Sequence, residues 1–278
     1  MMRIPFGVSR FDSQIGGGAP EGSVVLLAGS AGAGAREFLY TSAVFNGLLQ
    51  NDLDLFDLHY GSLSREAEPP SEVHYVSFSS SRADVRREIS FSMEEEIVDA
   101  GLGGVTFHDL SAEYFQLSPV PREWYVDGPR SLSDLGAQDE RRTVIQAFAD
   151  YLDEHATDSL VVVDSLTDLL GDEQHERPWS DVVYLLKGLR KAAREWGGLV
   201  LLHLSRDAVT ETEFGELMSS VDGTIQFGWE TGGNERVRSM FVQEFRGVLS
   251  QLEEEDIVRF ETEIHEAGFD VSNVRKIR

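Results

Sequence analysis

The chain has 278 residues, 41% of them hydrophobic, and a formal net charge of −25, which is a globular composition rather than a disordered one. It contains no cysteine, so disulfides, thiolate chemistry and cysteine zinc sites are excluded. No stretch approaches the roughly 20 apolar residues that span a membrane, and the first residues lack the apolar core of a signal peptide, so we expect a cytoplasmic protein with no membrane contact.

The acidity is spread along the chain, and only three of its 24 basic residues are lysine. This composition is typical of a protein from a salt-loaded cytoplasm, where self-repulsion is screened over about 3 Å at 1 M salt. An acidic protein that binds basic partners is the alternative. No basic cluster is present to contact phosphates, so nucleic-acid binding is not expected.

Apolar runs and the turn-forming residues between them predict strands that alternate with helices in the first half of the chain. A continuous apolar strand at 23–28 leads into a helix that ends near residue 49. Residues 51–72 are polar, end in prolines and show no clear period, so a long surface loop is expected there. A strand, a charged helix, a second strand and an irregular stretch follow at 73–78, 82–99, 105–110 and 111–138.

The pattern is clearer in the second half. We predict an amphipathic helix at 139–156 and a buried strand ending in an acid at 159–164. A helix at 180–196, a strand at 198–205 and a helix at 211–220 follow, and the strands 223–227 and 237–245 form a hairpin. This order predicts an α/β fold, with a mainly parallel central sheet flanked by helices and an antiparallel C-terminal edge. No repeat or low-complexity linker interrupts it, so we expect a single domain over 1–278, with 51–72 and 111–138 as surface insertions that contact partners.

Residues 26–38, LLAGSAGAGAREF, have the layout of a phosphate-binding loop between a strand and a helix. In such a loop the glycines let backbone N–H groups approach the phosphates, and the following helix directs its N-terminal donors to the same place. A lysine neutralises the phosphates and a hydroxyl residue binds Mg²⁺. Gly29, Gly32 and Gly34 retain the backbone part, whereas Ala35 and Arg36 stand in place of the two functional side chains.

Segments along nearly the whole chain resemble KaiC-like ATPase domains of the RecA superfamily. The lead-in GVSRFDSQIGGGAPEGS at 7–23 is similar to the G-(I/V)-x-x-(L/F)-D-x-x-(I/L)-G-G-G-x-P-x-G-S pattern before that family's phosphate loop. SLVVVDSLTDLL at 159–170 resembles the Walker B segment, and VDGTIQF and VRSMFVQEFRG, at 221–227 and 237–247, resemble the C-terminal strands. The resemblance implies a RecA-like P-loop fold, ATP and Mg²⁺ as ligands, and hexameric rings with nucleotide between subunits.

The chain departs from the family pattern at positions that contact phosphate, metal or attacking water. The family's lysine aligns with Ala35, its Mg²⁺-binding hydroxyl residue with Arg36, and its glutamate pair after the second strand with Ser79 and Ser80. The lysine that faces a neighbouring subunit's nucleotide is replaced by Glu244. A lysine about 4 Å from a phosphate charge is worth roughly 4 kcal/mol at an effective dielectric near 20, and loss of a general base costs about 10²–10⁴ in rate.

With these losses, the resemblance predicts a degenerate, acidic member of haloarchaeal type. We expect a regulatory or interaction module, with a role such as signal transduction, that lacks efficient ATP hydrolysis; no catalytic residue is assigned. The alternative is a nucleotide-binding protein or slow ATPase, and the third hypothesis is a single-stranded DNA accessory factor, disfavoured because no basic and aromatic groove is apparent. Protein partners are expected and a homo-oligomer is possible, although the changed interface residues weigh against the family's ring.

Any remaining nucleotide site is expected at the loop and at the Walker B acid. Its candidate residues are Gly29, Ser30, Ala31, Gly32, Ala33, Gly34, Ala35, Arg36 and Asp164. Asp164 contacts Mg²⁺ only with bound nucleotide, and otherwise caps a strand end. Arg36 either contacts phosphate or pairs with Glu37 or Glu21. Away from the loop, residues 79–81 are predicted to form a turn and helix cap, and His203 to be a packed strand residue.

Overall fold

The computed structural model describes residues 2–116, 118–126, 143–170, 179–232, 235–254 and 257–276. Within these residues the main sheet consists of β3 (Ser23–Gly29), β4 (Val73–Ser77), β5 (Val105–Asp109), β6 (Leu160–Asp164), β7 (Leu199–Ser205), β8 (Gly223–Gly232), β9 (Glu235–Phe245), β10 (Ile257–His265) and β11 (Gly268–Lys276). They lie in the order β11-β10-β9-β8-β3-β7-β6-β4-β5. Neighbours from β8 to β5 are parallel and those from β8 to β11 antiparallel. The predicted mainly parallel sheet with an antiparallel C-terminal edge is confirmed.

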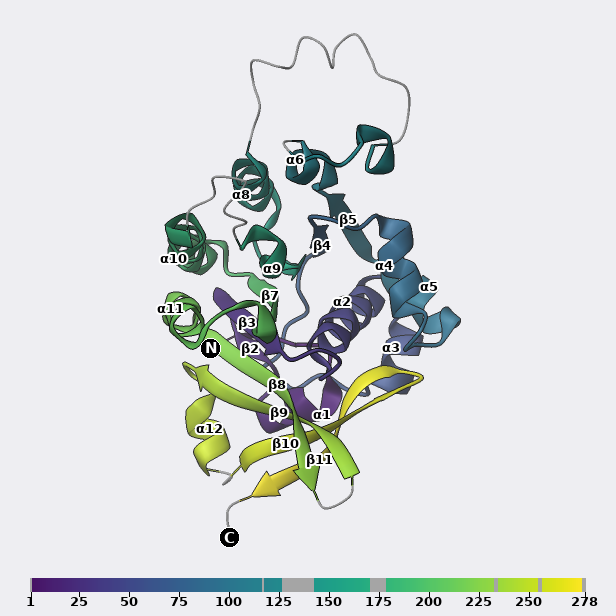
Figure 1. Cartoon of the computed structure of the whole chain (residues 1–278). Coiled ribbons are helices and arrows are strands. Elements are labelled where there is room, and N and C mark those ends of the chain that lie inside the picture. The colour runs from purple at the N-terminus through teal and green to yellow at the C-terminus, as the bar shows by residue number, and fades with distance from the viewer. Residues whose placement is uncertain are drawn as a thin grey trace.

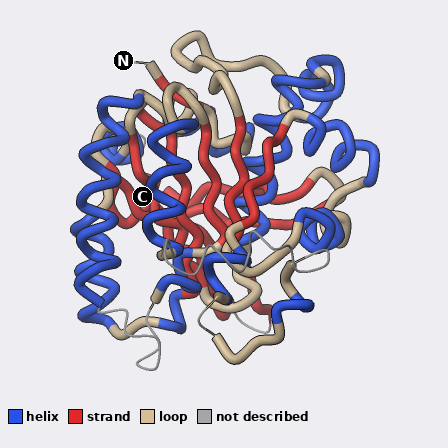
Figure 2. The backbone as a smooth tube through the Cα atoms, turned by 90° about the horizontal axis from the view of Figure 1, so that it is seen from above, coloured by secondary structure: helices blue, strands red, loops and turns tan. Residues whose placement is uncertain are grey.

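Helices cover both faces of the parallel strands (Figures 1 and 2). One face packs against α1 (Ser9–Gln14), α2 (Ala35–Asn51), α3 (Leu53–His59), α4 (Arg82–Ile89), α5 (Glu95–Gly103) and α12 (Leu249–Glu254). The other packs against α8 (Val144–His155), α9 (Leu166–Leu169), α10 (Trp179–Trp196) and α11 (Glu211–Ser220). Because both faces are covered, every residue of β3 and β6 is buried, which explains the continuous apolar runs in the sequence.

The lead-in before β3 is organised by the buried carboxylate of Asp12. One oxygen accepts the N–H of Phe6 at 2.9 Å, and the other accepts those of Gly7 and Val8 at 3.0 and 3.2 Å and the hydroxyl of Tyr60 at 3.0 Å. Gly7 has a φ of 81°, in the left-handed region that favours glycine. Burial raises the pKa of Asp12 to about 7, while these donors favour the carboxylate. The glycine and aspartate of the lead-in pattern therefore have a structural role.

A second, small sheet holds the lead-in beside the main sheet. It pairs β1 (Arg3–Ile4) with β2 (Ala19–Pro20) in antiparallel register. Gly18, at a φ of 131°, passes so close to the backbone of Ile4 that an added Cβ would lie 2.1 Å from its carbonyl oxygen. The last glycine of the GGG run is therefore required by close packing of two backbone segments.

The segment 51–72, predicted as a surface loop, contains a helix. α3 directly follows α2, and the Asp52 side chain caps it by accepting the N–H of Leu55 at 3.0 Å. Of its residues only Phe56 is buried, so the helix lacks the periodic apolar stripe that identifies longer helices. The loop prediction was therefore wrong for the residues of α3.

The predicted continuous helix at 82–99 is two helices, α4 and α5. Two serines form hydrogen bonds to the backbone in the turn between them. Ser90 Oγ donates to the carbonyl of Arg86 at 2.9 Å, and Ser92 Oγ donates to that of Ile89 at 3.2 Å. Short polar side chains of this kind compete with the helical ladder for backbone groups, and here they accompany its end. The prediction was correct for the helical content of both halves and wrong for the turn.

The stretch 111–138 begins with short helical elements, α6 (Ser111–Phe115) and the 3₁₀ helix η1 (Arg122–Trp124). Residues 117 and 127–138 lie outside the described residues. Among the helices of the described residues, none is long and apolar enough to cross a bilayer.

The Asp12 network gives a prediction for stability. Replacing Asp12 with alanine leaves buried N–H groups without an acceptor, so we expect the free energy of unfolding to fall by about 3 kcal/mol or more. Asp12→Asn keeps one accepting oxygen and is expected to lose less. Urea unfolding in molar KCl measures both, with the exposed Asp153→Ala as a control. A change below about 1 kcal/mol in Asp12→Ala would contradict this role.

Candidate functional site

The glycine-rich loop lies between β3 and α2, as predicted. Gly32 and Gly34 have φ values of 69° and 109°, and Gly34 is the residue that precedes the first turn of α2. Ala33 closes the turn by donating its N–H to the carbonyl of Ser30 at 3.0 Å. The backbone thus has the strand–turn–helix arrangement that can direct amide donors at an anion.

Side chains from the antiparallel strands lie over this loop. Trp229 of β8 donates its indole N–H to the carbonyl of Ala31 at 3.1 Å, and Arg238 of β9 donates from Nε to the carbonyl of Gly32 at 3.0 Å. The guanidinium of Arg238 also lies 4.8 Å from the centre of the Trp229 ring. The loop is therefore held from outside by the C-terminal strands, a contact that the sequence did not predict.

Gly34 is required by one of these contacts. A Cβ added there would lie 2.9 Å from Cε2 of Phe269 on β11, in addition to the strain of its left-handed φ. The Phe269 ring is itself packed edge-on against Phe38 of α2, with ring centres 5.3 Å apart. This glycine therefore has a packing role as well as its place in the loop pattern.

The loop amides already have some protein acceptors. Ser30 donates its N–H to the carbonyl of Phe227 at 3.2 Å, and Ala31 donates to a carboxylate oxygen of Asp207 at 3.3 Å. Asp207 belongs to the 3₁₀ helix η4 (Arg206–Ala208), directly after β7. An exposed carboxylate at the loop opposes a phosphate at the same place, because the two carry like charges.

Arg36 points from the first turn of α2 to Asp164, the predicted Walker B acid. Its Nη2 lies 3.3 Å from Oδ1 of Asp164, at the carboxyl end of β6, and its Nη1 lies 3.9 Å from a carboxylate oxygen of Glu88 on α4. The alternatives of a pair with Glu37 or Glu21 are not what the structure shows. Glu37 is next to Arg36 in sequence and Glu21 precedes the loop. Arg36 instead contacts Asp164, because a buried carboxylate needs a counter-charge.

Asp164 is the centre of a buried polar cluster. Its side chain is 8% exposed, and Oδ2 accepts the hydroxyl of Tyr75, from the neighbouring strand β4, at 2.7 Å. His203 on β7 places Nδ1 3.6 Å from Oδ1, and this buried nitrogen has no hydrogen-bond partner. Tyr40 on α2 donates to the same Glu88 carboxylate oxygen that Arg36 approaches, at 2.6 Å.

The cluster shifts the pKa of each group around the carboxylate. Burial opposes the charge of Arg36, but the surrounding acidic groups, Asp164 foremost and Glu88 among them, together raise the guanidinium pKa. Burial and the nearby Asp164 charge raise the pKa of Tyr75, so its hydroxyl stays protonated and donates. Burial lowers the pKa of His203 to about 4, although Asp164 acts in the opposite direction, so this imidazole is neutral at pH 7.

The residues around Asp164 do not suit a bound Mg²⁺ ion. One carboxylate oxygen accepts from Tyr75, and the other faces the guanidinium of Arg36, a fixed positive charge that repels a second cation. Across the described residues no group of three or more His, Asp or Glu side chains could hold a metal ion. The Ala35 side chain is buried and offers no charge to a phosphate.

The remaining predicted positions have structural roles. Ser81 caps α4 by accepting the N–H of Asp84 at 3.3 Å, and Ser80 donates its N–H to the hydroxyl of Ser77 at 3.0 Å. This confirms the predicted turn and helix cap at 79–81. His203 is a buried strand residue, as predicted, although its contact with Asp164 was not foreseen. Glu244 is exposed on β9, opposite Thr224 of β8.

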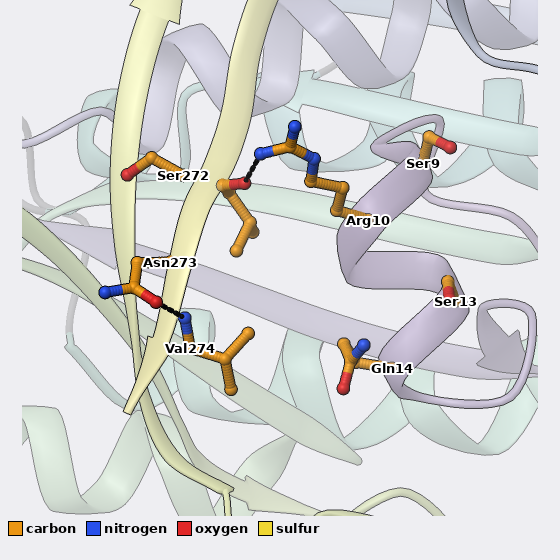
Figure 3. A pocket seen from close by; sticks show the side chains of 8 residues that line it. Ser9, Arg10, Ser13, Gln14, Ser272, Asn273 and Val274 are labelled. Atoms are coloured by element: carbon orange, nitrogen blue, oxygen red, sulfur yellow. Dashed lines mark hydrogen bonds between the residues drawn. The ribbon is translucent and has the colours of Figure 1, made fainter. Parts of the chain in front are cut away.

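A separate groove of about 400 Å³ lies between α1 and β11 (Figure 3). Two of its polar side chains, Arg10 and Asn273, have partners within the chain. Arg10 donates to the carbonyl of Val271 at 2.8 Å and pairs with Asp270 at 3.6 Å, and the Asn273 side chain accepts the N–H of Val274 at 2.9 Å. These contacts satisfy backbone groups of Val271 and Val274 on β11, the outer strand of the sheet.

No protein-family model matches the chain, and a comparison with curated proteins finds no match either. Among solved structures it matches the crystal structure of a KaiC-like protein from the hyperthermophilic archaeon Pyrococcus horikoshii OT3, with a TM-score of 0.60 and 18% sequence identity. The match covers 98% of this chain and 99% of that chain. The chain has a KaiC-like fold. At this identity the likeness concerns the fold alone, and the chemistry of the glycine-rich loop depends on its own side chains.

The Arg36–Asp164 contact gives a prediction for stability. Arg36→Ala leaves the buried carboxylate without its cation, but Arg36 is 46% exposed and solvent screens the pair, so we expect a loss of about 1–2 kcal/mol. A double-mutant cycle with Asp164→Asn, followed by urea unfolding, isolates the interaction. Once Asp164 is neutral, removing Arg36 should cost almost nothing. Strictly additive losses would show that the two side chains are not coupled.

His203 gives a prediction for pH dependence. Its pKa of about 4 in the folded state lies below the unfolded value of 6.5, so the unfolded state binds more protons between these values. The stability that His203 contributes is therefore lost as the pH falls through 6.5 toward 4, by about 2 kcal/mol at pH 5. Between pH 7.5 and pH 5, the wild type should lose that much more unfolding free energy than His203→Gln. Parallel curves for the two proteins would contradict the prediction.

Proposed function

We propose that the chain is a KaiC-like domain that acts as a regulatory or interaction module without efficient ATP hydrolysis. The observation that carries this proposal is the Arg36 guanidinium 3.3 Å from the Asp164 carboxylate. In the KaiC-like pattern, the equivalents of these two positions hold Mg²⁺ between them. Here one supplies a positive charge to the other, so the cation is part of the chain.

The other positions of the pattern support the same conclusion. Ala35 supplies no charge to a phosphate, and Ser79 and Ser80, in the turn before the Ser81 cap of α4, offer no carboxylate base at the positions of the glutamate pair. A serine hydroxyl cannot activate water at neutral pH without a base of its own. His203 is neutral and buried beside Asp164, with Nδ1 facing a carboxylate rather than a site for substrate.

Binding of an anion or nucleotide without hydrolysis is the second candidate. It is favoured by the geometry of the loop, because helix α2 starts directly after Gly34 and the N–H groups of its first turn have no partner within the helix. Asp207 and the missing lysine oppose it electrostatically. A loop of this kind is expected to bind nucleotide weakly, with no selectivity for the magnesium complex.

Titration of Mg-ATP by calorimetry in roughly molar KCl tests the proposal. We expect no saturable binding at micromolar ATP and hydrolysis at the background rate. Exchange of both residues, Ala35→Lys with Arg36→Thr, returns a phosphate-binding cation, frees Asp164 and supplies a hydroxyl ligand. This variant should bind Mg-ATP at least tenfold more tightly than the wild type, since a nearby lysine is worth several kcal/mol.

The same exchange in an Asp164→Asn background is the control, and it should lose the magnesium dependence of binding. Thermal unfolding without nucleotide verifies that each variant is folded. Saturable micromolar binding by the wild type would reject the interaction-module proposal in favour of the second candidate. Turnover above background in the wild type would reject both.

A further inference from the structure

The outer face of α10 carries a basic and aromatic stripe. Tyr184, Lys187, Gly188 and Lys191 are spaced three, four and seven residues apart, so they follow one face of the helix. Tyr184 is 69% exposed, and both lysines are exposed. We call these four residues the α10 stripe. It holds two of the three lysines of a chain whose net charge is −25.

The two lysines of the stripe differ from the arginines of the same helix in having no partner within the described part of the chain. Nearby arginines of α10 are engaged: Arg190 donates to the carbonyl of Ser219 at 3.0 Å, and Arg194 pairs with Asp222 at 3.3 Å. Lys187 and Lys191 have no hydrogen bond or ion pair among the described residues. Two neighbouring cations on an acidic protein are thus free to meet an acidic surface.

Gly188 is not required by the fold of the chain. It lies in the middle of a helix of 18 residues, where glycine is unfavourable relative to alanine. A Cβ built at this position would meet nothing within 4 Å, so no internal packing excludes a side chain. Without a side chain at 188, the outside of the helix between Tyr184 and Lys191 is open to solvent.

Helix α3 presents a surface of complementary chemistry. Leu53 and Leu58 are 60% and 74% exposed, and Asp54 and Asp57, which lie between them in sequence, are exposed as well. With spacings of four residues from 53 to 57 and from 54 to 58, these side chains share one face of the helix. We call them the α3 patch. The capping side chain, Asp52, is already engaged by its own helix.

The α10 stripe and the α3 patch of one chain cannot meet. α3 packs into the core through Phe56 on one face of the sheet, and α10 packs through Val182 and Leu186 on the other. Figure 1 shows the two helices on opposite sides of the molecule. Any contact between these surfaces therefore joins different molecules.

We propose that the α10 stripe of one copy docks on the α3 patch of a second copy. Lys187 and Lys191 pair with Asp54 and Asp57, and a leucine of the patch enters the space that Gly188 leaves beside Tyr184. The two surfaces differ, so the contact is heterologous, and each added copy presents a free stripe and a free patch to the next. The contact uses neither the glycine-rich loop nor Asp164, so it does not depend on whether the chain binds or hydrolyses nucleotide.

Charge reversal tests the contact through the mass of the protein in solution. Light scattering or sedimentation of the full chain, up to roughly 200 μM in 0.3 M KCl, should show concentration-dependent association of the wild type. Lys187→Glu with Lys191→Glu should weaken it about tenfold or more, as should Asp54→Lys with Asp57→Lys. The two reversed proteins, each impaired alone, should associate when mixed, because each reversed surface then meets a reversed partner.

Gly188 adds a test that separates docking from stability. Gly188→Ala should raise the Tm by about 2 °C, because alanine favours the helix, and should weaken association by crowding the stripe. Gly215 on α11 is the matched control, since a Cβ there also meets nothing within 4 Å. Gly215→Ala should raise the Tm similarly and leave association unchanged.

Three results would overturn the proposal. The first is a wild type that stays monomeric at all these concentrations, and the second is association that survives both charge reversals. The third is a monomeric wild type that binds single-stranded DNA and loses it in Lys187→Glu with Lys191→Glu, which would assign the α10 stripe to nucleic acid. ATP titration of the same proteins measures nucleotide binding at the loop independently of association. Failure of one proposal is therefore distinguishable from failure of the other.

Discussion

The arrangement around the loop depends on one buried charge, the carboxylate of Asp164. It ends an interior strand of the sheet, where an ion without a partner would cost several kcal/mol. Two elements supply its partners, Arg36 from α2 and Tyr75 from β4, while the neutral imidazole of His203 on β7 lies beside it without a hydrogen bond from Nδ1. The guanidinium therefore links the helix after the loop to the interior of the sheet. In an active relative of this fold, a bound metal and nucleotide would have to supply that link.

The glycines of the loop are explained by packing within the chain. Glycines in a phosphate loop are usually explained by the close approach of a ligand. Here Gly34 also allows the approach of Phe269, and Gly29 the approach of the Ala35 side chain, whose Cβ would lie 2.6 Å from an added Cβ. Packing within the chain is thus sufficient to require both residues. Their presence in the sequence does not by itself indicate a ligand.

The sequence predicted the order and type of most strands because both faces of the parallel sheet are covered, which makes the strands continuous apolar runs such as SVVLLAG and LVVVD. It failed where local polar groups decide the structure, at the Asp52 cap of α3 and at the serine turn after α4.

At the site, the missing side chains at 35, 79 and 80 were evident from the pattern alone. The partner of Arg36 was not, because sequence proximity favoured Glu37 and Glu21, whereas the fold brings a buried carboxylate from a distant strand. Trp229, Arg238 and Phe269 gave no signal, since nothing local marks a strand residue that covers a loop.

The altered positions are consistent with one another in a way that a single substitution would not be. A lysine at position 35 with Arg36 unchanged would place two cations beside Asp164, and a hydroxyl residue at position 36 alone would leave the carboxylate without a counter-charge. Ser81, directly after the two serines that stand in place of the glutamate pair, accepts the Asp84 N–H and caps α4, the helix that brings Glu88 toward Arg36. The residues at 35 and 36 are therefore compatible with each other, and a return of either one alone to the ATPase pattern is unfavourable beside Asp164. This mutual dependence supports the proposed module without efficient ATP hydrolysis, rather than a phosphate site that lacks one side chain.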